Sequence, residues 1–179
     1  MAIKVAINGF GRIGRCTLRA IYEQGLQNEF DVVAINAAGD LKTNSHLLKY
    51  DTTHGRFRTS VETEGENCII VDGKKIAFYS TKNPKDINWA DHGVDIVLEC
   101  TGAYTSKAKA QPLLEQGAKR VLISAPGGDD VDATIVYGVN EGTLKAGMTV
   151  VSNASCTTNC LAPVAKILSD SVGIKQGLM

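Results

Sequence analysis

The 179-residue sequence has no net charge, because 19 Lys and Arg residues balance 19 Asp and Glu residues. A balanced chain has no net field to attract nucleic acid or an anionic membrane, so a small-molecule partner is favoured. No apolar run is long enough to span a bilayer, and the opening Met1-Ala2-Ile3-Lys4-Val5 lacks the long apolar region of a signal peptide. We therefore expect a cytoplasmic protein that binds neither nucleic acid nor membrane.

Paired cysteines are also lacking. The five cysteines are odd in number and include no Cys-x-x-Cys pair of the zinc-binding type. The simplest explanation is a set of free thiols in a reducing cytoplasm, without a metal site. Repeats, low-complexity stretches and long linkers are absent as well. The length fits one domain, or one domain with a piece of another.

What is present is an alternation of apolar runs and helical patterns. Strand-like runs cover residues 3–7, 31–36, 94–99, 121–123, 134–137 and 148–151, and helical patterns cover 12–24 and about 106–116. This alternation predicts parallel βαβ units with right-handed crossovers, that is, an α/β fold of the Rossmann type with a doubly wound, mostly parallel sheet. Residues 55–80 differ: short antiparallel strands are expected at 56–58, 68–71 and 75–79, with a hairpin turn at 72–73.

The first predicted strand runs into a glycine-rich turn. Residues 9–14, Gly-Phe-Gly-Arg-Ile-Gly, fit the GxGxxG pattern, with a helix after them and a strand after that. Gly9 permits the tight turn, Gly11 lets the backbone approach a pyrophosphate, and Gly14 allows close packing of helix on strand. The amides and dipole of the helix start bind phosphates. The pattern predicts NAD or NADP binding, with a glycine-rich turn that binds no ligand as the alternative.

The end of the second predicted strand bears on the choice between the two cofactors. An acidic residue there commonly binds the adenosine ribose. In this sequence we assign the position to Asn36, which is followed by Ala37-Ala38-Gly39. A neutral side chain binds hydroxyls without repelling a 2′-phosphate, and small neighbours leave room for one. The sequence therefore leaves NAD and NADP open.

Cys156 lies between small polar residues just before a third helical pattern. The positive end of a helix favours a thiolate, which makes Cys156 a candidate covalent nucleophile. Attack on an aldehyde, hydride transfer to a nicotinamide and resolution of the thioester by water or phosphate would follow. Ser155 and Thr157 would hold a phosphate, and the Cys156 amide would stabilise the oxyanion. Cys160, one turn later, is expected to be a small buried side chain.

A general base for Cys156 is not evident. His46, His54 and His92 all lie far back in the sequence, within the predicted cofactor region. We expect His46 on a helix surface, His92 in a polar turn and His54 in a loop near a subunit interface. Each remains a weak candidate for the base.

Together these motifs resemble the phosphorylating glyceraldehyde-3-phosphate dehydrogenase family. The likeness covers essentially the whole chain and is carried by residues 7–15, 50–55, 99–102, 123–126 and 152–163. It implies oxidation of D-glyceraldehyde 3-phosphate with inorganic phosphate to 1,3-bisphosphoglycerate, through a thioester on Cys156 and with NAD or NADP. It also implies a role in glycolysis, gluconeogenesis or carbon fixation, and a homotetramer for the complete enzyme.

The resemblance implies residue roles as well. Asn36 would meet the adenosine ribose, and Lys82 stands where the family often has an arginine near that ribose, so it would meet a 2′-phosphate. Ser155 and Thr157 would form the inorganic-phosphate subsite. The other implied cofactor contacts are the backbone of Arg12 and Ile13 with the pyrophosphate, and Thr101, Gly102 and Ser124 along the adenine and nicotinamide side.

The resemblance further implies an NAD(P)-binding domain at residues 1–151 and the start of a catalytic domain, with the nucleophile helix, at 152–179. In the family, a segment like Gly177-Leu178-Met179 precedes the catalytic histidine, the arginine for the substrate phosphate and the catalytic sheet. We therefore expect this chain to bind cofactor and to be catalytically crippled. Two alternatives stay open: an erythrose-4-phosphate dehydrogenase, and a stand-alone dinucleotide-binding module.

Overall fold

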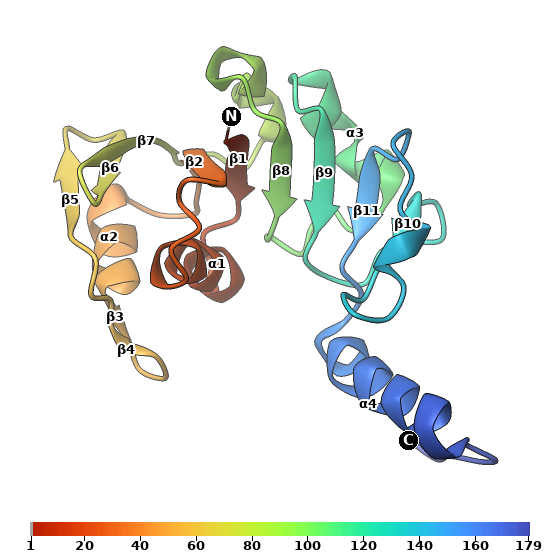
Figure 1. The fold of residues 1–179 in the computed structure, drawn as a ribbon. Helices are drawn as coiled ribbons and strands as arrows, with labels where there is room; N and C mark the ends of the chain where they lie inside the picture. Colours follow the sequence, from red (N-terminus) through yellow and green to blue (C-terminus); the bar gives the residue numbers. More distant parts are fainter. Residues whose placement is uncertain (1) are drawn as a thin grey trace.

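A nine-stranded sheet organises the chain (Figure 1), and the computed structural model describes residues 2–179. The strand order is β10-β11-β9-β8-β1-β2-β7-β6-β5, parallel from β10 to β7 and antiparallel from β7 to β5. The strands are β1 (Ile3–Asn8), β2 (Phe30–Asn36), β5 (Val61–Glu64), β6 (Cys68–Val71), β7 (Lys74–Tyr79), β8 (Ile96–Glu99), β9 (Arg120–Ile123), β10 (Ala133–Thr134) and β11 (Val150–Ser152). The predicted α/β fold with a mostly parallel sheet is confirmed.

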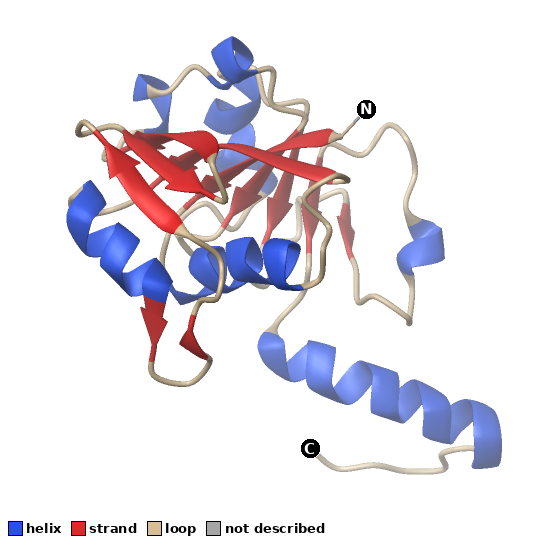
Figure 2. Ribbon diagram, turned by 60° about the vertical axis from the view of Figure 1, so that its left-hand side comes forward, coloured by secondary structure: helices blue, strands red, loops and turns tan. Residues whose placement is uncertain are grey.

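Helices cover both faces of the sheet (Figure 2). Helices α1 (Arg12–Glu23) and α2 (Leu41–Lys49) lie on one face, and α3 (Lys107–Glu115) lies on the other. Alternate residues of β1 accordingly enter different cores: Ile7 packs with Leu18 of α1, whereas Ala6 belongs to the cluster that contains Leu113 of α3. The remaining elements are 3₁₀ turns at Pro84–Asp86, Trp89–His92 and Glu141–Thr143, and the small separate hairpin of β3 (Tyr50–Asp51) and β4 (Gly55–Arg56).

Two predicted strands differ most from the structure, while those at 94–99 and 148–151 match β8 and β11 to within two residues at each end. The run at 134–137 was too long, because β10 ends at Thr134 and the Val136 amide donates to Asn140 Oδ1 (2.8 Å), which turns the chain. The run at 56–58 lies outside the main sheet, with Arg56 paired to Tyr50, and the sequence reading missed β5. The hairpin turn at 72–73 is confirmed, with positive φ at both Asp72 (52°) and Gly73 (75°).

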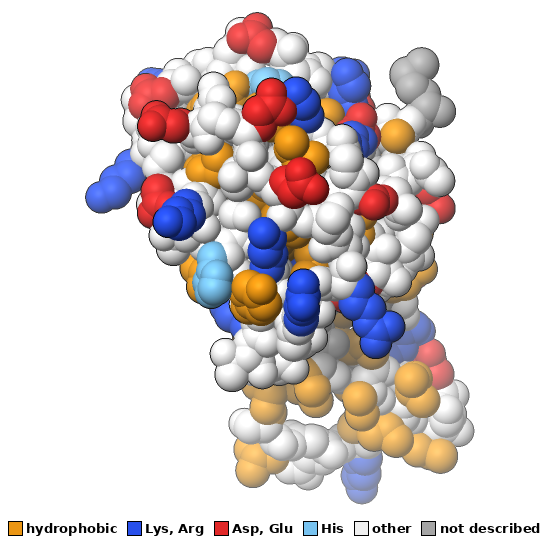
Figure 3. Space-filling model, turned by 90° about the vertical axis from the view of Figure 1, so that its left-hand side faces the viewer, with side chains coloured by type: hydrophobic (Ala, Val, Ile, Leu, Met, Phe, Trp, Pro, Cys, Tyr) orange, Lys and Arg blue, Asp and Glu red, His pale blue; other side chains and the backbone are white. Residues whose placement is uncertain are grey.

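Helix α4 (Cys156–Val172) extends away from the sheet (Figures 1 and 2). Its hydrophobic side chains gather at the lower end of the molecule, below a body that carries charges of both signs (Figure 3). None of its residues is buried, and with the segment 173–179 it lines an open groove of about 740 Å³. The expectation of a buried Cys160 was wrong: this side chain is exposed, because nothing between residues 2 and 179 packs over that part of α4.

Candidate cofactor and nucleophile site

The parallel strands bring the predicted motifs to one edge of the sheet. The chain leaves β1 into the turn at 9–14, leaves β2 after Asn36, leaves β8 into Thr101, and leaves β11 into the start of α4. Strand order reverses at β1, since the chain first adds β2 on one side and later adds β8 on the other. Open α/β sheets bind ligands outside the carboxyl ends of their strands at such a point.

The glycine turn shows the steric need for two of its glycines. Gly9 has φ of 99°, and a Cβ there would lie 2.6 Å from Cys100 C and from Thr101 N. A Cβ on Gly14 would lie 2.3 Å from Gly9 O, so α1 packs directly on the turn. Gly11 has open space instead and, as the N-cap of α1, has no side chain to cap the first amides. This combination leaves the helix start accessible to an anion, so the residues present fit a dinucleotide phosphate.

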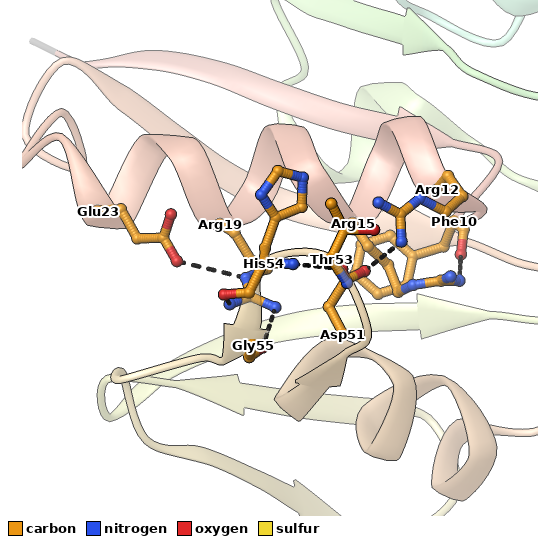
Figure 4. A network of polar contacts seen from close by, with 9 residues as sticks. All are labelled: Phe10, Arg12, Arg15, Arg19, Glu23, Asp51, Thr53, His54 and Gly55. Atoms are coloured by element: carbon orange, nitrogen blue, oxygen red, sulfur yellow. Dashed lines mark hydrogen bonds and ion pairs between the residues drawn. The ribbon is translucent and has the colours of Figure 1, made fainter.

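Arg12 and Ile13 form the exposed first turn of α1. The Arg12 side chain donates to Asp51 Oδ2 (2.5 Å), as Figure 4 shows. Asp51 also accepts from the backbone amides of His54 (2.8 Å) and Thr53 (2.9 Å). These amides, together with the Arg12 guanidinium, hold the pKa of Asp51 below its usual range. Because the Arg12 side chain is bound to Asp51 in this loop, only the backbone of Arg12 is available for the predicted pyrophosphate contact.

A second arginine ties the same loop to α1 (Figure 4). Arg19 is 3% exposed, donates to the carbonyls of Gly55 (3.1 Å) and His54 (3.4 Å), and lies over the Phe57 ring at 5.1 Å from its centroid. Its Nε also donates to Glu23 (3.3 Å). Through Arg12 and Arg19, the segment 50–55 therefore helps to hold α1, the helix that follows the glycine turn, in position.

A cavity of about 270 Å³ opens beside the turn. Four of the predicted cofactor residues line it, namely Gly9, Asn36, Lys82 and Thr101. Gly102 and Ser124 do not line it, although each lies next to the edge: Gly102 follows Thr101, and the Ser124 amide donates to Glu99 O (3.0 Å). The full lining is Asn8, Gly9, Asn36, Ala37, Ala38, Thr81, Lys82, Thr101, Ala103 and Tyr104. No carboxylate is part of this lining.

The Asn36 side chain is committed to internal contacts. It is nearly buried, its Nδ2 donates to Asn8 Oδ1 (2.8 Å) and Thr81 O (3.1 Å), and its Oδ1 accepts from the Thr81 amide (3.1 Å). Ala37 and Ala38 line the cavity next to it; Ala38 is exposed, whereas Ala37 is 2% exposed. A ribose contact by Asn36 stays a prediction, and the sequence reading missed that these two alanines form part of the wall.

Glu99 is the polar residue that sequence reasoning missed most clearly. It is 1% exposed, and its carboxylate accepts from Asn8 Nδ2 (2.5 Å), the Thr101 amide (2.7 Å) and the Thr101 hydroxyl. Burial raises the pKa of Glu99, while the hydrogen bonds from Thr101 and Asn8 oppose that rise. The signal that could have identified it is an acidic residue at the end of an otherwise apolar strand. Burial likewise raises the pKa of the neighbouring Cys100 to about 11, so this thiol stays protonated.

Cys156 is the exposed first residue of α4. Ser155 caps the helix: its Oγ accepts from the Thr158 amide (2.9 Å) and lies within hydrogen-bond distance of the hydroxyls of Thr157 (2.9 Å) and Thr158 (2.6 Å). Three hydroxyls therefore surround the helix start next to the thiol. This is an arrangement that can donate hydrogen bonds to a phosphate.

The strand before this helix start is firmly held. Ser152 is fully buried, donates from Oγ to Ala125 O (2.7 Å), and accepts from the amides of Gly127 (3.0 Å) and Ala154 (3.0 Å). Ala154 has φ of 60°, a conformation that directs the chain sharply from β11 into α4. The position of Cys156 relative to the sheet edge is thus set by the backbone that precedes it.

No hydrogen bond within residues 2–179 joins a histidine to Cys156. His46 is exposed on α2 beside the Tyr50 ring, as expected of a helix-surface residue, and His54 lies in the β3–β4 turn. His92 Nε2 lies 2.7 Å from Tyr79 Oη, in the 3₁₀ turn before β8 and hence at the opposite end of that strand. In the same described range, no three His, Cys, Asp or Glu side chains are grouped to hold a metal ion, and no helix is long and apolar enough to cross a membrane.

Comparison with known proteins agrees with the geometry. The family model "Glyceraldehyde 3-phosphate dehydrogenase, NAD binding domain" matches residues 3–107, and "Glyceraldehyde 3-phosphate dehydrogenase, C-terminal domain" matches residues 155–179. The plasmid glyceraldehyde-3-phosphate dehydrogenase of Cupriavidus necator is 57% identical over all 179 residues, which cover 53% of that protein. The enzymes so named from Pseudomonas aeruginosa and Cereibacter sphaeroides are 54% and 56% identical over the whole chain, which covers 53% and 52% of them.

This chain thus spans about half the length of the curated relatives it matches. The predicted family and the predicted NAD(P) cofactor are confirmed by the matching NAD-binding model and by these relatives. The chain belongs to the glyceraldehyde-3-phosphate dehydrogenase family.

Proposed function

We propose that this chain supplies the cofactor site and the nucleophile of an NAD(P)-dependent glyceraldehyde-3-phosphate dehydrogenase. The observation that carries the proposal is that one sheet edge holds both the glycine turn before α1 and, through β11, Cys156 at the start of α4. As part of this proposal, residues 1–151 form the cofactor domain and residues 152–179 begin the catalytic domain, a division that falls before the last residue of β11, Ser152. The homotetramer implied by the resemblance belongs to the whole enzyme and is part of the same proposal.

The chemistry assigned to Cys156 follows from its place. Its thiolate attacks the aldehyde carbon of glyceraldehyde 3-phosphate and forms a hemithioacetal, after the thiol proton has left to solvent or to a base. Cys156 then holds the carbon whose hydride a bound NAD(P) would accept. A thioester on Cys156 remains. Inorganic phosphate then attacks the thioester carbonyl, the carbon–sulfur bond breaks, and 1,3-bisphosphoglycerate leaves with the thiolate regenerated.

Neighbouring groups support each step. Ser155 and Thr157 would hold the attacking phosphate by their hydroxyls, and the Cys156 amide would stabilise the oxyanion of the tetrahedral species. No histidine in residues 2–179 is hydrogen-bonded to Cys156, so general acid–base help for the thiol is missing from this part of the enzyme. Such help is typically worth about 10²–10⁴-fold in rate. The 179 residues alone should therefore bind cofactor and turn over slowly.

We further propose that the cofactor site accepts NADP as well as NAD. The cavity wall at the end of β2 consists of Ala37 and Ala38, the Lys82 side chain is exposed at the same cavity, and no carboxylate lines it. A 2′-phosphate would thus meet small side chains and a cation.

Calorimetric titration of the 179-residue chain with each cofactor tests both proposals. Binding of NADP within about a hundredfold of NAD, or about 2.7 kcal/mol, is the expected result. A larger NAD preference contradicts dual specificity alone, whereas binding of neither cofactor contradicts the cofactor site itself.

A further inference from the structure

A buried carboxylate lies beneath the cofactor cavity, and the chemistry described so far does not use it. Glu99 ends β8, in the centre of the sheet edge, and is 1% exposed. Burying an ionised carboxylate is unfavourable unless hydrogen bonds replace the lost water. The hydrogen-bond partners of Glu99 therefore indicate which parts of the fold its carboxylate stabilises.

One set of hydrogen bonds approaches Glu99 from β2. The backbone of Thr81 fixes the orientation of the Asn36 amide, because Thr81 N–H donates to Asn36 Oδ1 (3.1 Å) and Thr81 O accepts from Asn36 Nδ2 (3.1 Å). Asn36 Nδ2 must then donate to Asn8 Oδ1 (2.8 Å), which leaves Asn8 Nδ2 to donate to Glu99 Oε2 (2.5 Å). Every donor in this series points toward Glu99.

A second set approaches from the other side. The Thr101 amide donates to Glu99 Oε1 (2.7 Å). The Ala103 amide donates to Thr101 Oγ1 (3.0 Å), so the Thr101 hydroxyl directs its own proton to Glu99. Both sets begin at backbone N–H groups, which cannot reverse. The group between them must accept on both oxygens, and an ionised carboxylate meets that requirement.

The partners of Glu99 are also the walls of the cavity. Thr81 precedes Lys82 on one wall, and Thr101 forms another. The glycine turn lies between them: the Gly9 amide donates to Asn36 O (2.9 Å), and its Cα packs so closely on the Cys100–Thr101 peptide that a Cβ would lie 2.6 Å away. A small displacement of Thr101 would therefore reach the turn.

We infer that Glu99 is a positioning residue for cofactor binding: through Asn8, Asn36 and Thr101 its carboxylate holds the glycine turn and the two adjacent walls in register. The inference rests on the proposed function, because NAD or NADP is taken as the ligand of this cavity. The inference requires that each hydrogen bond in the series runs from donor to acceptor in the direction described. Polar groups at these positions with the wrong direction would not be enough.

Exchanging donor and acceptor tests that demand. Glu99→Gln places an NH₂ group against Asn8 Nδ2, and Asn8→Asp places a second carboxylate against Glu99. The double variant N8D/E99Q restores every pairing, because the new amide at position 99 donates to the carboxylate at position 8, which still accepts from Asn36. Here N8D and E99Q are measured singly and together, with E115Q as the control for an exposed carboxylate on α3.

Dissociation constants for NAD and NADP are measured at pH 8, at a temperature where circular dichroism shows folded protein, and unfolding temperatures are recorded. Leaving a buried group unpaired typically weakens an interaction by about tenfold or more. We expect such a loss in E99Q and N8D, recovery of NAD affinity to within about threefold of the parent in the double variant, and no change in E115Q. A double variant that binds NAD no better than E99Q overturns the inference, as does unchanged NAD affinity in E99Q.

The remaining outcomes are also decisive. A lowered unfolding temperature with unchanged affinity in folded E99Q shows a purely structural carboxylate and overturns the positioning role. If E99Q does not fold, a double variant that folds and binds supports the inference, and one that fails to fold overturns it. A parent chain that binds neither cofactor contradicts the proposed function itself, an outcome distinct from a parent that binds and an E99Q that binds equally well.

Discussion

The cofactor edge and the nucleophile helix are built in opposite ways. At the cofactor edge, Asn8, Asn36 and Glu99 are nearly or fully buried and pair with one another and with the backbone. In α4 no residue is buried, and the helix is held by the turn that enters it and by the Ser155 cap. The difference teaches that this chain forms its proposed cofactor site by its own contacts, whereas Cys156, the proposed nucleophile, lies on a helix that the rest of the chain does not pack against.

The largest effect is expected from Gly9→Ala, a substitution at the cofactor edge, which is the buried region of the two. Its Cβ would lie 2.6 Å from the backbone of Cys100 and Thr101, at a φ of 99°. Strain at a special backbone position and a backbone clash together should cost several kcal/mol and reduce cofactor affinity by at least about 100-fold. Urea unfolding and cofactor titration measure the two effects.

Gly25→Ala is the matched control. Gly25 also has positive φ (72°), but its Cβ would meet nothing within 4 Å. It should lose only about 1 kcal/mol of stability and keep its cofactor affinity. Equal losses of affinity in the two variants would show that the clash at Gly9 does not shape the site.

A smaller effect is expected from Ala38→Asp, which tests the comparison at the cavity wall. Ala38 is exposed and lines the cavity, so an aspartate there would lie close to the place proposed for a 2′-phosphate. Charge repulsion should weaken NADP by about tenfold or more, roughly 1.4 kcal/mol, relative to NAD. Ala38→Asn, which has the same size without the charge, should leave the NADP to NAD ratio nearly unchanged. A ratio that shifts equally in both variants would assign the effect to bulk.

The smallest effect is expected at the start of α4. Ser155→Ala removes the oxygen that accepts from the Thr158 amide, a change that typically costs about 1 kcal/mol of helix stability. Because α4 buries none of its residues, hydrogen exchange in its first turn should quicken about fivefold while β1 and β8 stay unchanged. Ser155→Asp keeps a capping oxygen and should retain the original exchange. Quickened exchange spread through the sheet of the alanine variant would contradict the separation of the two regions.

Local patterns predicted much of this molecule. The turn at 9–14 and the helix beginning at Cys156 could be predicted from the sequence. The residues that form each of them, such as small residues, a preceding strand and a helix cap, lie within a few positions of each other. The parallel sheet followed from the alternation of strands and helices. The extent of β10 was misjudged because the Asn140 side chain, rather than a propensity, ends the strand.

Contacts between distant residues were the part that the sequence did not reveal. Asn8 and Glu99 are 91 positions apart, and Asn36 and Thr81 are 45 apart, so their pairing depends on strand order and register. The sequence assigned Asn36 to the ribose, which stays a prediction, but it did not reveal that the Asn36 amide joins β1 to the loop at Thr81. The burial of Cys160 was misjudged for a similar reason, because helix spacing does not say what covers a helix.

The central claim is that the cofactor site is complete within these residues and the catalytic site is not. It is tested most directly by measuring cofactor binding and phosphate-dependent NAD(P)H formation on one preparation of the 179-residue chain, with glyceraldehyde 3-phosphate as substrate and a full-length relative as reference. The account predicts saturable cofactor binding together with a turnover at least about 10²-fold below the reference. Turnover equal to the reference, or the absence of cofactor binding, would contradict it.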